Sequence, residues 1–82
     1  YVIRIKGEGF QDEMLLDGDL IIVEARNDPA EGETVIAMIN GHDPLIKIFE
    51  RESGYIKLYG HNPQQHPLIM HPDDLSIYGV VV

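Results

Sequence analysis

Turn signals at hairpin spacing most constrain how this chain folds. Asn40-Gly41 is the strongest of them, because both residues tolerate the positive φ angles of a tight turn between antiparallel strands. Ser53-Gly54 marks a second tight turn, and residues 27–32 collect the Pro, Gly, Asn and Asp residues that favour turns. Short runs of β-branched and aromatic residues lie between these turns. The pattern predicts an antiparallel β fold.

The runs between the turns predict six to eight strands, because their residues alternate in polarity or are mostly β-branched. The expected strands are 1–6, 20–23, 34–39, 45–50, 55–59, 68–70 and 76–82. We expect the continuous apolar run 20–23 to be buried on both faces. Helical periodicity is confined to 11–15. The predicted fold class is mainly β: a curled antiparallel sheet or partly open β-barrel with hairpins and at most one short helical turn.

The length of 82 residues indicates one small domain, assigned to residues 1–82. Cysteine is absent, so no disulfide or thiolate-metal site stabilises the fold, which suits a reducing compartment such as the cytoplasm. The chain has no apolar run of about 18 residues, so we expect no membrane-spanning segment. Because it begins within a predicted strand, we also expect a further N-terminal part before Tyr1.

The charge balance bears on the choice of partner. Fourteen Asp and Glu residues against six Lys and Arg residues give a formal charge of −8. A surface this acidic repels a phosphate backbone, and no local cluster of basic residues offsets it. We therefore expect that this domain does not bind nucleic acid by itself.

A loop with glycines near both ends joins the first two expected strands. It begins with Gly-Glu-Gly-Phe at 7–10 and ends with Leu-Asp-Gly-Asp at 16–19, eight positions separating Gly9 from Asp17. This segment resembles the active-site segment of the LexA-type self-cleaving repressors, in the superfamily that includes LexA, UmuD and signal peptidases. The spacing matches the LexA and UmuD branch.

Later segments continue the resemblance in the family's order. Residues 33–37 and 45–47 resemble the strand pair that carries the family's catalytic lysine. Residues 62–69 and 72–82 resemble its C-terminal end. No single motif is specific, but the ordered set covers nearly the whole chain.

The chain departs from the family pattern at the nucleophile. The resemblance places the catalytic serine at Gly9, which has no side chain, so no acyl-enzyme can form there. The family's methionine and threonine are also replaced, by Phe10 and Leu45, while Ser53 and Ser76 lie outside the motif. These further losses favour natural decay over a single engineered change. We expect the chain to be inactive as a peptidase.

Lys47 matches the position of the family's general base. By period-two counting it shares a strand face with Leu45 and Phe49, so we expect its side chain to be partly desolvated. In the family, burial favours the neutral amine, which serves as base to the serine. Lys47 also fits a strand lysine paired with a carboxylate such as Glu8. The two interpretations are compatible.

Three histidines recur every five residues, at His61, His66 and His71. In a loop followed by a strand, this spacing does not place the rings on one face, and metal sites use tighter pairs. We therefore expect no metal site and no cofactor. A pH-sensitive surface is the alternative.

The terminal run 76–82 is apolar and carries no lysine or proline, so it fits an exposed edge strand that can pair with a strand of another chain. A central strand already paired within the domain fits it equally well. The resemblance implies homodimerisation through this region. The candidate contact residues are Ile77, Tyr78, Gly79, Val80 and Val81.

The resemblance implies the C-terminal dimerisation and regulatory domain of a LexA-like transcriptional repressor of the SOS response to DNA damage, here unable to self-cleave. It further implies a helix-turn-helix domain outside residues 1–82 that binds operator DNA, and a RecA filament as partner. Three alternatives remain. They are a UmuD-type polymerase accessory subunit, a serine-lysine self-processing peptidase whose nucleophile was removed, and a metal- or ligand-binding β module.

Overall fold

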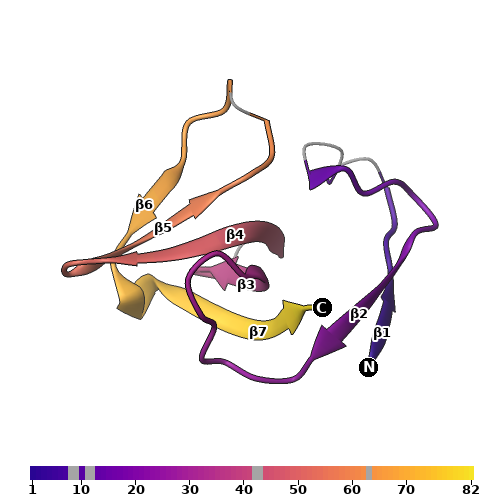
Figure 1. Ribbon diagram of the computed structural model, residues 1–82, viewed down its shortest axis with the longest axis horizontal. Coiled ribbons are helices and arrows are strands. Elements are labelled where there is room, and N and C mark those ends of the chain that lie inside the picture. The colour runs from indigo at the N-terminus through magenta and orange to yellow at the C-terminus, as the bar shows by residue number, and fades with distance from the viewer. Residues whose placement is uncertain (8–9, 11–12, 42–43, 63) are drawn as a thin grey trace.

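The computed structural model describes residues 1–7, 10, 13–41, 44–62 and 64–82. Its strands form one curled, open antiparallel sheet in the order β1-β2-β7-β3-β4-β5-β6 (Figure 1). The strands are β1 (Val2–Arg4), β2 (Leu20–Glu24), β3 (Thr34–Ile39), β4 (Leu45–Glu52), β5 (Tyr55–Tyr59), β6 (Leu68–Met70) and β7 (Leu75–Val81). A 3₁₀ turn, η2 (Pro72–Asp74), leads into β7. The predicted mainly β class is confirmed.

The turns lie where their residue types predict them. Asn40 and Gly41 adopt φ angles of 46° and 77° as the chain leaves β3 for β4, and Gly54 adopts 83° between β4 and β5. The expected helical turn at 11–15 lies partly outside the described residues. No helix in the described part of the chain has the length and apolar character needed to cross a membrane.

The core consists of two clusters on opposite faces of the sheet. The first cluster is formed by the fully or nearly fully buried side chains of Val35, Ala37, Phe49, Ile56, Leu58 and Val80. The second is formed by Ile5, Ile21, Val23, Ile36 and Ile46. β3 contributes consecutive residues to both clusters, because successive side chains on a strand point to opposite faces. The curled sheet therefore encloses apolar side chains on both sides of its centre.

The prediction that 20–23 is buried on both faces is wrong. Ile21 and Val23 are buried, whereas Leu20 and Ile22 leave 61% and 58% of their surfaces exposed. β2 pairs with the short edge strand β1, in the flank of the sheet away from the first cluster. No described element covers the outer face of this flank, so only one face of β2 is buried.

The last strand, β7, is central. It pairs with β3 along its length and with β2 at Val80 and Val81. Gly79 permits this approach, since a Cβ there would overlap the Cγ1 of Val23 and lie 2.9 Å from the carbonyl oxygen of Glu24. Of the two sequence-based interpretations, the centrally paired strand is confirmed.

Candidate functional site

Lys47 lies in β4 directly opposite Val35 of β3, on the face of the sheet that carries the first cluster. Its side chain retains 16% of its accessible surface, so the expected partial desolvation is confirmed. An amine that has lost this much water needs a polar partner.

The partner of Lys47 is Glu13. The Nζ atom donates a hydrogen bond of 2.7 Å to Oε1 of Glu13, whose side chain is only 5% exposed. A carboxylate partner was expected for Lys47, with Glu8 as the example, and the observed partner is Glu13. Glu8 itself lies outside the described residues. Truncating one member of such a pair leaves a buried charge without its counter-ion.

A tight turn aims Glu13 at the sheet. The N–H groups of Glu13 and Leu15 both donate to the carbonyl oxygen of Phe10, at 3.1 and 3.2 Å. Met14, between them, adopts a φ of 62°, in the left-handed region that non-glycine residues seldom occupy. Phe10 and Leu15 pack against the second cluster. Apolar side chains thus anchor the turn while the carboxylate of Glu13 reaches Lys47.

The Asp-Gly-Asp motif closes the loop that carries this turn. Asp17 Oδ1 accepts from the N–H of Gly7, and Asp19 Oδ2 accepts from the N–H of Leu16, each at 2.8 Å. Gly18 adopts a φ of 92°, and its N–H donates to the carbonyl oxygen of Ile5 at 2.7 Å. The motif therefore joins the two ends of the loop to each other, just after the first strand.

Gly60 completes the surroundings of the pair. A Cβ built on it would lie 2.6 Å from Oε1 of Glu13 and 3.4 Å from Nζ of Lys47. The absent side chain therefore leaves the space that the carboxylate occupies. Three segments far apart in the sequence meet at this point: the first loop, β4 and the residue after β5.

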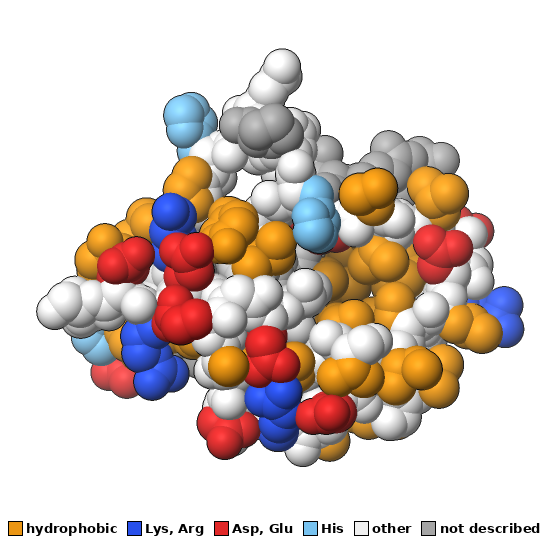
Figure 2. Space-filling view, viewed as in Figure 1, with side chains coloured by type: hydrophobic (Ala, Val, Ile, Leu, Met, Phe, Trp, Pro, Cys, Tyr) orange, Lys and Arg blue, Asp and Glu red, His pale blue; other side chains and the backbone are white. Residues whose placement is uncertain are grey.

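Hollows adjoin Lys47 on two sides. One, of about 400 Å³, is lined by Lys6, Phe10, Glu13, Pro44, Leu45, Ile46 and Lys47. The other is lined by Leu45, Lys47, Leu58, Tyr59, Gly60, Gln64, Gln65, His66 and Leu68. Figure 2 shows hydrophobic side chains in the hollowed region between the β1–β2 flank and the centre of the sheet. Lys47 and Leu45 thus contribute to the lining of both concave surfaces.

Gly9, the position that the resemblance gives to the nucleophile, lies outside the described residues. The two serines are where the sequence placed them, Ser53 after the end of β4 and Ser76 in β7. Leu45, which replaces the family's threonine, lines both hollows beside Lys47.

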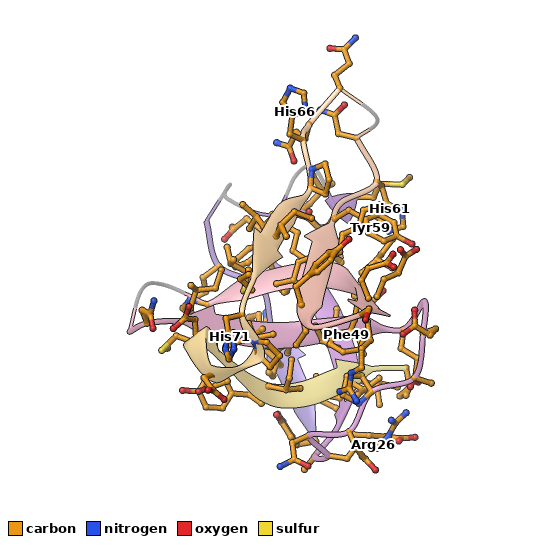
Figure 3. All side chains as sticks on the ribbon, turned by 90° about the vertical axis from the view of Figure 1, so that its left-hand side faces the viewer. Arg26, Phe49, Tyr59, His61, His66 and His71 are labelled. Atoms are coloured by element: carbon orange, nitrogen blue, oxygen red, sulfur yellow. The ribbon has the colours of Figure 1, made fainter. Side chains whose placement is uncertain are left out.

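The histidines are dispersed. His61 and His66 lie on the connection between β5 and β6, well apart from His71 (Figure 3). His71 caps η2, its Nδ1 accepting a 3.1 Å hydrogen bond from the N–H of Asp73. In the described residues, no three His, Asp or Glu side chains are grouped so that they could hold a metal ion.

Two further charged contacts, away from Lys47, support the framework. Arg26 binds Glu24 at 2.8 Å and Glu33 at 2.6 Å, which lowers the pKa of Glu33 from its ordinary value, chiefly through the hydrogen bond from Arg26. Tyr59 donates a 3.0 Å hydrogen bond to Glu50, and this bond, with a smaller effect of burial, raises the pKa of Tyr59. Figure 3 labels Arg26 and Tyr59.

The candidate dimerisation residues differ in accessibility. Tyr78 is 51% exposed and occupies a register shift between β7 and β3, its hydroxyl contacting the sulfur of Met38. Ile77 and Val81 are half-buried, whereas Gly79 and Val80 are buried within the chain's own sheet. Among these residues, Tyr78 offers the most surface to a partner.

A family profile described as Peptidase S24-like matches residues 1–82. The chain is 37% identical over 79 residues to a LexA repressor of Clostridium novyi (strain NT), and 31% identical over 81 residues to one of Clostridioides difficile (strain 630). These matches cover 96% and 99% of the chain but only 38% of each relative. The chain therefore spans less than half the length of these relatives.

Proposed function

The chain belongs to the Peptidase S24-like family, and from this premise we propose that it is the C-terminal regulatory and dimerisation domain of a LexA-like repressor that does not cleave itself. The similarity to LexA repressors over nearly the whole chain supports the repressor assignment. Gly9 at the position that matches the nucleophile is the observation that carries the proposed loss of cleavage, and the contact between Lys47 and Glu13 supports it.

Self-cleavage by the family's chemistry needs a nucleophile and a base within reach of each other. Gly9 supplies no nucleophilic atom at the matching position. The amine that matches the base already donates to a carboxylate at 2.7 Å. Neither role is filled, so the domain acts by binding and pairing rather than by cutting.

Operator binding and dimerisation divide between two parts of the longer protein. The net charge of −8 is unsuited to holding a phosphate backbone, so operator DNA is bound by a helix-turn-helix domain outside residues 1–82. Two copies of this domain pair through the β7 region, with Tyr78 exposed at the contact. Such pairing would match a two-fold symmetric operator.

Incubation of the full-length repressor with activated RecA filaments, or at alkaline pH, tests the loss of cleavage. We expect an intact chain on denaturing gels. Two stable fragments divided ahead of Tyr1 would contradict the proposal.

Sedimentation of the full-length protein and of a Tyr78→Asp variant tests the pairing. We expect a dimer for the parent and weaker association for the variant, because a buried carboxylate without a partner is costly. A helix-turn-helix sequence upstream of residue 1 would separate the repressor from the UmuD-type alternative.

A further inference from the structure

We propose that Glu13 is an internal ligand of the Lys47 ammonium, and that this contact independently blocks Lys47 from acting as a base. The proposal deepens the proposed function, on which its inhibitory meaning rests. The contact itself rests on geometry alone: a 2.7 Å hydrogen bond between side chains that are 5% and 16% exposed.

The surroundings of Glu13 indicate a built position rather than a chance surface contact. Its carboxylate occupies the space left by the absent side chain of Gly60, 2.6 Å from where a Cβ would lie. Its backbone is held by the turn on Phe10, and Met14 adopts a left-handed φ of 62° to complete that turn. Backbone strain of this kind persists where the surrounding structure requires it.

A need for stability alone does not explain a buried Glu–Lys pair. Well-packed apolar residues in place of a buried ion pair are often at least as stabilising, because the two charges lose their hydration. The first loop already anchors itself through Phe10 and Leu15 in the second cluster. The pair therefore contributes something that packing does not: Glu13 is a fixed hydrogen-bond acceptor for the Lys47 amine.

The chemical consequence concerns the lone pair of Nζ. An ammonium that donates to Glu13 has no lone pair with which to accept a proton from a hydroxyl. If a serine were placed at position 9, its Oγ could attack a peptide carbonyl only if its proton passed to a neutral Lys47 and then to the departing amine. The contact with Glu13 opposes the first of these transfers. Restoring the hydroxyl is therefore insufficient while Glu13 is present.

Lysine acylation with an N-hydroxysuccinimide ester, read by peptide mass spectrometry, tests the contact in the full-length protein. This domain contains three lysines, so Lys6 and Lys57 serve as internal references for Lys47. In Glu13→Gln we expect Lys47 to react roughly tenfold faster relative to Lys57, as when a buried charged partner is lost. The matched control is Glu50→Gln, which removes a looser 4.0 Å partner of Lys57. In this control Lys47 is compared with Lys6, and its relative reactivity should be unchanged.

Gly60→Ala provides a second variant that keeps both charged residues. Its Cβ would displace the carboxylate of Glu13, so Lys47 should again react faster. Unchanged Lys47 reactivity in both folded variants would overturn the proposal. Circular dichroism of each variant confirms that the sheet is retained.

A cleavage assay tests the inhibitory meaning. We expect Gly9→Ser to remain intact at neutral pH, and Gly9→Ser with Glu13→Gln to divide into two fragments. Equal cleavage of both, or of neither, would overturn the inhibitory role of Glu13. Cleavage of the unaltered protein would instead overturn the proposed function, so the two failures are distinguishable.

Discussion

Two groups of charged side chains in this domain differ in how they are built. Glu13 and Lys47 are 34 residues apart, nearly buried, and meet only because the first loop folds against β4. Arg26 binds Glu24 and Glu33, two and seven residues away, and remains about one-third exposed. The first contact requires the tertiary fold, whereas the second is local and shared with solvent. The first contact should therefore contribute more to the free energy of unfolding than the second.

Loss of the Glu13 carboxylate should have the largest effect. In Glu13→Ala we expect the free energy of unfolding to fall by about 3 kcal/mol, the low end for a broken buried pair, because Lys47 keeps some access to water. Urea unfolding followed by circular dichroism measures this. A fall as small as that of the exposed control Glu24→Ala would erase the contrast between the two groups.

Replacement of both members of the buried pair should cost much less. In Glu13→Leu with Lys47→Met, we expect a free energy of unfolding within about 1 kcal/mol of that of the parent, because no charge is left without a partner. The same urea titration measures it. A loss equal to the sum of the single-variant losses would show that the two side chains are not coupled.

Tyr59 gives an intermediate, pH-dependent test. Its pKa is raised in the folded state, so the stability from its bond to Glu50 is fully present below about pH 10 and is lost as pH rises through the folded value. Ultraviolet titration should show one of the four tyrosines ionising above the others. In Glu50→Gln that late ionisation should move down; its persistence would assign the shift to burial instead.

The exposed Arg26 group should show the smallest effect, confined to acid. The pKa of Glu33 is lowered in the folded state, so its contribution is present above about pH 4.5 and is lost as pH falls through the folded value. Between neutral and acidic pH, the midpoint of thermal unfolding should fall slightly less in Arg26→Gln than in the parent. Added salt should weaken the Arg26 group and leave the Glu13–Lys47 pair nearly unchanged.

Much of the fold was predictable because its signals are local. The β3, β5 and β6 strands have their predicted bounds, because a β-branched run between turn residues can be recognised from the local sequence alone. The partial burial of Lys47 followed from period-two counting alone.

The failures of prediction concern which elements become neighbours. An apolar run such as 20–23 can be covered on one face or on both, and the answer depends on the place of β2 in the sheet order. Glu13 carries no local sign of its role: it is one acidic residue in an acidic segment. Only the return of the first loop to β4 makes it a partner of Lys47.

The turns, most of the strands and the absence of a nucleophilic side chain at Gly9 follow from the sequence alone, because backbone preference and side-chain identity are properties of single residues and short runs. Three features emerge only in the folded chain: β7 is central, one face of β2 stays exposed, and Glu13 binds Lys47 beside Gly60. These features depend on long-range strand order and on the space between elements, and neither is encoded within a short stretch of sequence.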